Sequence, residues 1–248
     1  MKKIFIVIFM FIHINSFAQN GRVNDYNTIG WLQTINTISL DKKWSLHLEY
    51  QFRRTEALKN WQQSLWRAGS NFRLNNNIVL HAGYGWIKTF PYGEFPIASQ
   101  GAFPEHRIYE QISFQQPMNR FSFSHRFRVE QRWLARMKAE PEIEVEDWIF
   151  LHRFRYQFRT QMALWSSDQK QFYAAAADEI FIGAGKNLGT NIFDQNRIFL
   201  LAGYKLNKNI SVEAGYINQT LQQGRKINDK TIMQRNNGFV FTTIGNFN

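Results

Sequence analysis

The sequence contains no cysteine, which excludes disulfide bonds, thiolate metal sites and lipid attachment through an N-terminal cysteine. After its first residues the chain also lacks any apolar run of about 18 residues, so no membrane-spanning helix is predicted. Glycine-rich phosphate loops, zinc-ligand spacings and the GxSxG motif of hydrolases are absent as well. The sequence therefore predicts no cofactor, no metal site and no enzyme of these motif-bearing classes.

The N-terminus resembles a secretory leader. Two lysines follow Met1, an apolar stretch runs over Ile4–Ile14, and Ser16 and Ala18 place small residues at the −3 and −1 positions of a cleavage site. We expect residues 1–18 to be a signal peptide cleaved after Ala18, and residues 19–248 to form the mature protein. The apolar stretch is too short to span a bilayer as a helix.

Acidic residues are scarce, with 19 Asp and Glu against 30 Lys and Arg. A basic surplus can indicate nucleic acid binding, but the leader argues against that, and the arginines do not form a run. We expect a monomer without a nucleic acid partner, in contact with outer-membrane lipid and anionic lipopolysaccharide. Buried ion pairs inside a barrel would account for part of the positively charged side chains.

The segment Phe121–Trp133 alternates between two kinds of residue without interruption. One parity is largely aromatic and includes Phe123 and Phe127, whereas the other carries Ser124 and Arg128. Successive side chains of a strand point to opposite faces, so this strand has an apolar face and a charged face. Repetition of the pattern along the chain favours a transmembrane β-barrel, in which only every second residue meets lipid.

Ten further segments have a comparable pattern. They are Tyr26–Leu40, Trp44–Arg54, Trp61–Leu74, Ile78–Phe90, His106–Gln116, Trp148–Trp165, Phe172–Gly185, Gln195–Leu206, Ile210–Gln222 and Ile232–Phe247. All five prolines fall between the segments, as expected for a residue that cannot donate to a ladder. Bacterial barrels have an even number of strands, so eleven segments leave three alternatives. A weak strand lies near Gln19–Asn27, the N-terminal segment threads the lumen, or one segment is not a strand.

Short and longer connections alternate between the segments. The short ones are 41–43, 75–77, 117–120, 166–170 and 207–209, and the longer ones are 55–60, 91–105, 134–147, 186–194 and 223–231. Six of the eight tryptophans lie near segment ends, where an aromatic girdle at the membrane interface belongs: Trp44, Trp61, Trp86, Trp133, Trp148 and Trp165. The sequence thus predicts one all-β antiparallel barrel of about 12 strands, with 10 as the alternative, in the outer membrane of a Gram-negative cell. Its short turns would be periplasmic and its longer loops extracellular.

The inward-facing parity collects charged residues. The expected lumen network consists of Glu49, Arg53, Arg67, Arg107, Arg126, Arg128, Glu130, Arg132, Arg153, Arg155, Arg159, Arg197 and Glu213. Arginine pairs with carboxylates through two parallel hydrogen bonds and keeps its charge. A narrow barrel filled by salt bridges is favoured over an anion-selective pore, which is the alternative. The sequence does not indicate which solute, if any, is transported or bound.

Two other function classes remain as alternatives. A lipid-modifying hydrolase of the outer membrane would need a serine within hydrogen-bonding reach of a histidine, but Ser124 and His125 are adjacent and face opposite ways. A soluble, lipocalin-like carrier would bury the aromatic parity and expose the arginines. Carboxylates between Glu140 and Asp147 could hold a divalent cation, although a solvated acidic loop is favoured.

Several short motifs occur in a characteristic order. They are Glu105-His106-Arg107, Arg126-x-Arg128-x-Glu130-Gln131-Arg132, Asp178-Glu179-Ile180-Phe181, Phe193-Asp194-Gln195-Asn196-Arg197 and Ala214-Gly215-Tyr216-Ile217-Asn218-Gln219. Together they resemble the domain-of-unknown-function family 2490, a group of outer-membrane β-barrel-like proteins. The resemblance implies a barrel over the mature chain and no particular activity. It also suggests that Asp178 and Glu179 lie at the outer rim, near Asp194.

The alternation makes a testable prediction about which face meets lipid. Phe123→Arg should impair membrane insertion, because an arginine on the lipid face costs about 2–4 kcal/mol near the bilayer midplane. Ser124→Arg, one residue along, should be tolerated. Heat-modifiable gel migration of membrane fractions measures the folded, inserted protein, and equal tolerance at the two positions would contradict the assigned parity.

Overall fold

The computed structural model describes residues 21–56, 58–98, 101–138, 144–188 and 191–247, so the expected signal peptide lies outside the described residues. Within these ranges the chain forms eleven strands and one short 3-10 helix, η1 (Lys186–Leu188). The strands are β1 (Arg22–Ser39), β2 (Trp44–Thr55), β3 (Asn60–Arg73), β4 (Ile78–Thr89), β5 (Phe103–Met118), β6 (Phe121–Met137), β7 (Val145–Ser167), β8 (Lys170–Ala184), β9 (Phe193–Lys205), β10 (Ile210–Ile227) and β11 (Lys230–Phe247). All eleven expected segments are strands, and most extend further than expected. Within the described ranges, no helix is long and apolar enough to cross a membrane.

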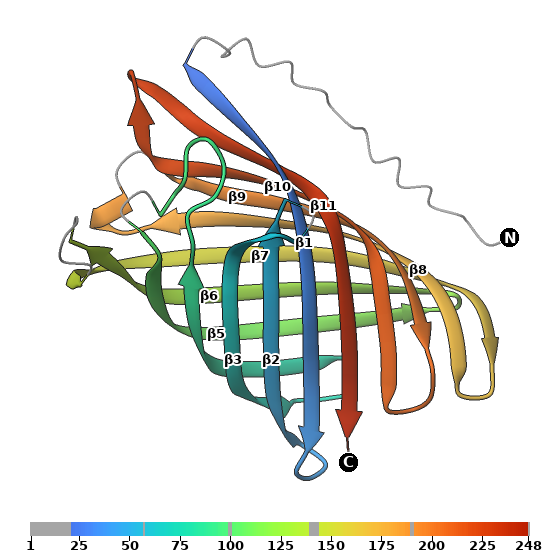
Figure 1. The fold of residues 1–248 in the computed structure, drawn as a ribbon. Helices are drawn as coiled ribbons and strands as arrows, with labels where there is room; N and C mark the ends of the chain where they lie inside the picture. The colour runs from blue at the N-terminus through green and yellow to red at the C-terminus, as the bar shows by residue number, and fades with distance from the viewer. Residues whose placement is uncertain (1–20, 57, 99–100, 139–143, 189–190, 248) are drawn as a thin grey trace, which may run out of the picture.

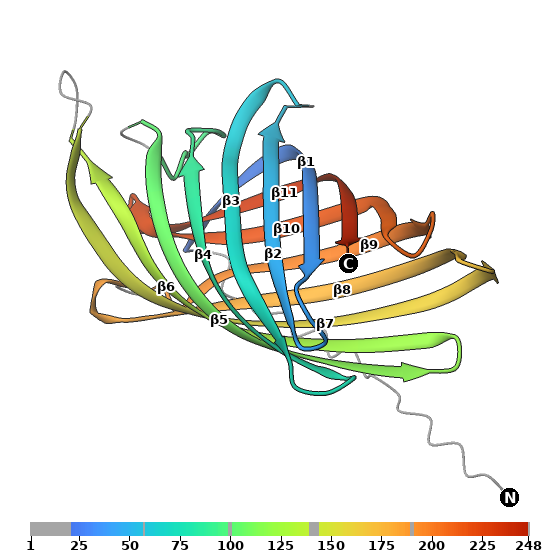
Figure 2. The same cartoon turned by 90° about the horizontal axis from the view of Figure 1, so that it is seen from below.

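The strands close into a barrel, which confirms the all-β barrel prediction (Figures 1 and 2). Neighbours in sequence pair antiparallel, whereas β1 and β11 pair in parallel from Arg22 opposite Thr231 to Ile38 opposite Phe247. An odd number of alternating strands forces this parallel seam, because the first and last strands then run the same way. The described chain therefore has eleven strands, one fewer than the twelve expected. Residues from Arg22 to Asn27 begin β1 and form no separate strand.

The connections separate into two ends of the barrel. We call the end with the short connections 40–43, 74–77, 119–120, 168–169 and 206–209 the turn end, and the opposite end the loop end. Strand β1 starts at the loop end and β11 finishes at the turn end, so the first and last strands begin and end at opposite ends of the barrel (Figure 1).

One connection differs from the sequence-based expectation. The predicted longer connection at 223–231 is wrong, because β10 continues to Ile227 and β11 starts at Lys230. Only Asn228 and Asp229 join them, with φ of 49° and 60°. A two-residue hairpin turn needs positive φ at both central positions, and Asn and Asp adopt that conformation most readily after glycine.

Three turns at the turn end use the same local device. A side-chain oxygen of Asp41, Asn75 or Asn207 accepts hydrogen bonds from the backbone N–H groups two and three residues later, at 2.7–2.9 Å. This side-chain mimicry of a turn fixes where the next strand begins. At Asp41 the bonds from Trp44 and Lys43 lower the pKa of the carboxyl group, so the turn keeps its acceptor charged.

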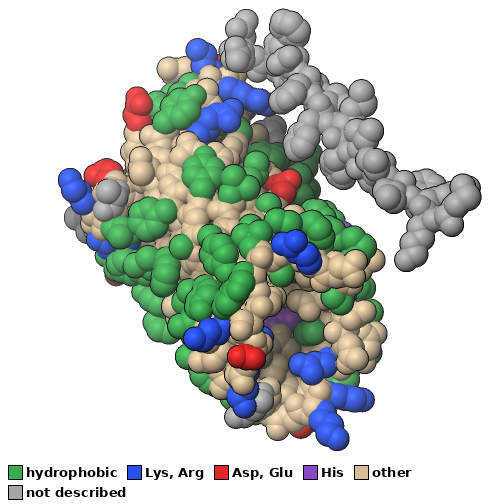
Figure 3. All heavy atoms as spheres, turned by 90° about the vertical axis from the view of Figure 1, so that its right-hand side faces the viewer, with side chains coloured by type: hydrophobic (Ala, Val, Ile, Leu, Met, Phe, Trp, Pro, Cys, Tyr) green, Lys and Arg blue, Asp and Glu red, His purple; other side chains and the backbone are tan. Residues whose placement is uncertain are grey.

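The outer face of the barrel is apolar. Phe127 on this face is 47% exposed, and many other large hydrophobic side chains of the described strands are exposed there as well. Figure 3 shows such side chains spread over the side of the molecule. The predicted parity of Phe121–Trp133 is confirmed, since Arg128 points inward and is 5% exposed.

The two tryptophans that were not expected near strand ends both lie well inside strands. Trp31 points into the lumen and is 1% exposed, whereas Trp66 lies on the outer face in the middle of β3. The expectation that every proline lies between strands is wrong for Pro104 and Pro117, which are the second and the second-last residues of β5. Near a strand end the missing N–H removes less of the ladder. Pro141 lies outside the described residues.

Candidate functional site: the charged lumen

The inner wall has two different sides. Where β9, β10, β11 and β1 lie side by side it carries a buried apolar cluster, formed by Ile29, Trp31, Ile217 and Val240 next to Phe199. The wall formed by β2 to β8 instead carries most of the charged side chains. The strand pleat creates both sides, because residues of one parity all face the lumen.

Glu130 on β6 lies at the centre of the charged wall and has no exposed surface. Its carboxylate contacts guanidinium nitrogens of four arginines: Arg153 at 2.5 Å, Arg155 at 2.6 Å, Arg107 at 3.5 Å and Arg128 at 3.8 Å. These arginines come from β5, β6 and β7. One buried carboxylate therefore holds three neighbouring strands to a common point.

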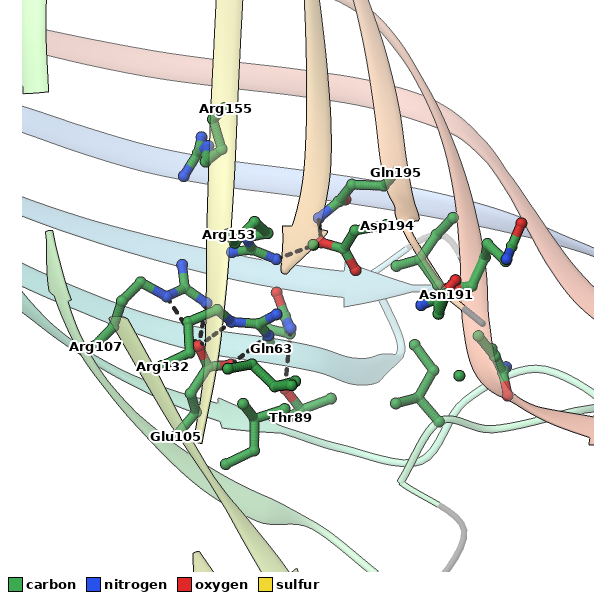
Figure 4. Close-up of a pocket in the computed structure, with 18 of the residues that line it drawn as sticks. Gln63, Thr89, Glu105, Arg107, Arg132, Arg153, Arg155, Asn191, Asp194 and Gln195 are labelled. Carbon is green, nitrogen blue, oxygen red and sulfur yellow. Dashed lines mark hydrogen bonds and ion pairs between the residues drawn. The ribbon is translucent and has the colours of Figure 1, made fainter. Parts of the chain in front are cut away.

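Three of these arginines reach a second acid. Arg107 donates to Glu105, Arg153 to Asp194 and Arg155 to Glu179. Glu105 also accepts two hydrogen bonds from Arg132, at 2.8 and 3.0 Å. Figure 4 shows the guanidinium groups around Glu105 and the contact of Arg153 with Asp194. The pairs thus join into one network along the wall from β5 to β9.

Two further pairs lie on either side of this network. Glu49 on β2 accepts a hydrogen bond from Arg67 at 2.7 Å. Glu213 on β10 accepts from Arg159 at 2.5 Å and from the hydroxyl of Tyr173 at 2.7 Å. Residue Gly203 provides the space for Tyr173, because a Cβ there would lie 2.2 Å from its ring.

Three aromatic rings that point into the lumen contact the guanidinium groups of arginines. The guanidinium of Arg53 lies 3.9 Å from the ring centre of Trp31, with Arg197 at 5.0 Å. Phe181 has Arg155 at 4.4 Å and Arg197 at 4.6 Å. Stacking on an aromatic ring suits arginine, whose planar group is weakly hydrated.

Tyr109 is the third ring and stands beside Gly83, where a Cβ would meet the phenol at 2.8 Å. Arg128 lies 4.3 Å from its ring centre and Arg67 lies 5.8 Å away. The Tyr109 hydroxyl is 3.0 Å from Nε2 of His81. This ring therefore links the arginines of β3 and β6 across the lumen.

The lumen contains two cavities. The loop-end chamber has a volume of about 240 Å³ and the turn-end chamber about 680 Å³. Both are bounded by Arg53, Arg67, Arg155 and Arg197, each at most 7% exposed. We call these four arginines, with Trp31, Tyr109 and Phe181, the septum. It separates the two chambers at mid-height.

The β4–β5 connection covers part of the loop end. The hydroxyl of Tyr92 donates to Gln234 on β11 and accepts from Gln62 on β3, and burial raises the pKa of its phenol. Asp25 on β1 accepts hydrogen bonds from the backbone N–H of Glu94 and Phe95, at 3.3 and 3.2 Å. The connection is therefore attached to both sides of the closing seam.

Residue Gly93 lets this connection approach the wall. Its φ is +78°, and a Cβ there would lie 2.4 Å from Asp25 Oδ2. A residue with a side chain would have to adopt a strained backbone and displace the Asp25 carboxylate.

All thirteen residues expected in the lumen network face the interior. The structure pairs most of them, but Arg53 has no carboxylate of the described residues within ion-pair distance and donates instead to Gln51 and Gln63. Arg197 donates to Gln195 at 3.2 Å and lies 4.0 Å from Glu179. The arginines of β6 and β7 lie side by side as expected, with Arg128 and Arg155 directly opposite in the ladder.

The sequence reasoning missed several members of the network. Glu105, Glu179 and Asp194 supply acids, and Trp31, Tyr109 and Phe181 supply rings. On β5, Glu105 and Tyr109 have the same parity as the inward Arg107, which was the available signal. The other four had no such signal, because β8 has no arginine, β1 has no inward arginine, and Asp194 differs in parity from the inward arginine of β9.

The rim position suggested for Asp178 and Glu179 is wrong. Asp178 pairs with Phe158 and Ile198 in the middle of the sheet. Because neighbours on a strand face opposite ways, Glu179 enters the lumen and Asp178 lies outside. Asn196 donates to the outer carboxylate at 2.5 Å, which provides a local partner that the sequence pattern did not reveal.

The histidines give no support to a serine hydrolase. Among the described residues, His47 contacts Glu49, His81 contacts Asn71 and Tyr109, His106 contacts Tyr84, and His125 contacts Tyr156. Their side-chain hydrogen bonds in the described ranges involve no serine. The acidic loop expected between Glu140 and Asp147 lies partly outside the described residues, and Glu144 contacts Lys138 at 3.8 Å.

The sequence matches the family described as "Protein of unknown function (DUF2490)" over residues 28–230. The chain belongs to this family. No curated protein matches it. Among solved structures, a "NanC porin structure in rhombohedral crystal form" is similar, with 12% sequence identity, a TM-score of 0.46, and coverage of 83% of this chain and 92% of the porin. The matched range of this DUF2490 member includes all thirteen charged residues of the expected lumen network.

Breaking the central contact should destabilise the barrel. Glu130→Gln should lower the free energy of unfolding by about 3–5 kcal/mol, because it leaves four buried arginines without their common anion. Glu146→Gln, at an exposed glutamate near the start of β7, is the matched control and should have little effect. Urea unfolding of the refolded barrel in detergent measures both, and equal unfolding midpoints would contradict the central role of Glu130.

Proposed function

We propose that this DUF2490 protein is a non-enzymatic outer-membrane β-barrel whose lumen the septum closes at mid-height. The leader over residues 1–18 would direct export and be removed after Ala18. The barrel would act as a monomer in contact with outer-membrane lipid and lipopolysaccharide, with the loop end outside the cell.

The distribution of polarity carries this proposal. Many large hydrophobic side chains of the described strands are exposed on the outer face, while the arginines and glutamates of the lumen network are buried or half-buried inside. Soluble monomers rarely expose apolar surface on this scale, whereas a barrel in lipid requires it. The soluble carrier alternative needs the opposite arrangement, with the aromatic parity inside, and the observed parity does not favour it.

The state of the lumen supports a closed barrel over an open pore. The septum arginines are at most 7% exposed, and Glu130 and Phe181 have no exposed surface. Ion pairs and ring contacts already hold the guanidinium groups that would otherwise form an anion-selective ring. Ions would have to separate these contacts in order to pass.

Site-specific labelling tests the location and orientation. An epitope tag beside Glu144 at the loop end should be labelled on intact cells. A tag at Asn76 in the turn-end connection 74–77 should be labelled only after the outer membrane is opened. The reverse pattern would contradict the proposed orientation, and recovery of the tagged protein in the soluble fraction would contradict membrane insertion.

Conductance tests whether the lumen is closed. The wild-type protein in a planar bilayer should show little current, because the septum blocks the lumen. Glu130→Ala should produce channels, since the four arginines lose the anion that holds them together and become hydrated. Glu146→Ala is the control and should behave as wild type. Large, steady, anion-selective currents from the wild-type barrel would overturn the closed-lumen proposal.

A further inference from the structure

The turn-end chamber carries a surplus of positive charge. Eight lysine or arginine side chains line it, against three glutamates. Those glutamates are Glu49, Glu179 and Glu213, and each is already hydrogen-bonded to an arginine. The chamber therefore contains more cationic groups than its own acids can pair.

Two arginines that line this chamber, Arg67 at Nε and Arg128 at one terminal nitrogen, have a buried nitrogen without a hydrogen-bond partner among the described residues, and only that of Arg128 is a terminal nitrogen. Nε and one terminal nitrogen of Arg128 donate to Gln111 Oε1, at 2.9 and 2.6 Å. The other terminal nitrogen has no hydrogen-bond partner among the described residues and lies 3.8 Å from Glu130. The side chain is 5% exposed, so bulk water does not replace the missing partner. Leaving a buried charged donor unpaired is costly, and a bound anion would remove that cost.

Two neighbours could share the same anion. Arg126 lies two residues before Arg128 on β6, lines the same chamber, and is 29% exposed. Lys205 lines the chamber at the end of β9 and is exposed. Glutamine carboxamides, among them Gln157 opposite Arg126 in the ladder, supply neutral donors nearby.

The entrance to the chamber is also basic. Lys42, Lys43 and Arg73 line a hollow of about 370 Å³ at the turn end, where Asp41 is the acidic residue. Figure 3 shows this end of the barrel as a hollow with lysine and arginine side chains around it. A cationic entrance raises the local concentration of anions.

We propose that the turn-end chamber is a binding site for a small oxyanion, a solute with a carboxylate or phosphate group, held by Arg128 and Arg126. Both groups present paired oxygens that fit the arginine fork. The septum forms the floor of the site, so the ligand enters and leaves from the turn end. This inference rests on the proposed function for two points, namely that the septum closes the lumen and that the turn end faces the periplasm.

Calorimetric titration of the refolded barrel in detergent at low ionic strength tests the site. The probes are succinate and inorganic phosphate. We expect saturable 1:1 binding of at least one probe, which Arg128→Gln weakens by about tenfold or more through loss of a charge-assisted contact. Lys186→Gln removes one positive charge from η1 at the loop end and should leave the affinity unchanged. Binding of succinate alone identifies a carboxylate ligand, binding of phosphate alone identifies a phosphate ligand, and each supports the site.

A second variant keeps the test decisive if Arg128→Gln does not refold. Lys205→Gln changes an exposed side chain at the strand end, and we expect affinity about two- to fivefold lower because one charge of the chamber is lost. Absence of 1:1 binding by the wild type, or equal affinity in the chamber variants and Lys186→Gln, overturns the proposal. Because the titration needs only the folded barrel, its result is independent of the labelling and conductance experiments. Binding by a barrel that is absent from the outer membrane would overturn the proposed function and leave the site standing.

Discussion

The burial of Glu130 is the constraint on which the lumen depends. A carboxylate without exposed surface needs close cations, and four arginines from three strands provide them. Each arginine then needs acceptors for its remaining donors, which draws in a second layer of partners: Glu105, Gln111, Glu179 and Asp194. One buried charge thereby sets the side chains of five neighbouring strands, from β5 to β9.

The apolar side of the inner wall makes this arrangement possible. Trp31 occupies the lumen from the closing seam and offers its ring to Arg53 and Arg197, which the acids do not fully pair. An aromatic face stabilises a cation without adding a negative charge. The lumen can therefore hold more arginines than carboxylates, and the septum brings these arginines together at mid-height.

The sequence predicted the barrel well because alternation is a local property. Every strand was found, and Phe123, Ser124 and Arg128 face the predicted sides, since parity follows directly from the pleat. Which side chains meet depends instead on register across strands and on the stagger of the barrel, and no single strand encodes either. That is why Glu179 was placed at the rim, although the ladder brings it to Arg155 at the centre. The tight turn at Asn228 was missed because several polar residues flank it in β10 and β11.

The parallel seam between β1 and β11 has a consequence for the connectivity of the chain. In a barrel with an even number of strands, the two termini lie next to each other at the same end. A short linker can then join them, and new termini can be made in another connection, which is a circular permutation. Here residue Gly21 and residue Phe247 lie at opposite ends. A linker would have to run the full height of the barrel, either through the lumen past the septum or along the apolar outer face, which in the proposed membrane setting would meet lipid, where unpaired backbone is excluded. A circularly permuted version of this barrel would therefore need a twelfth strand.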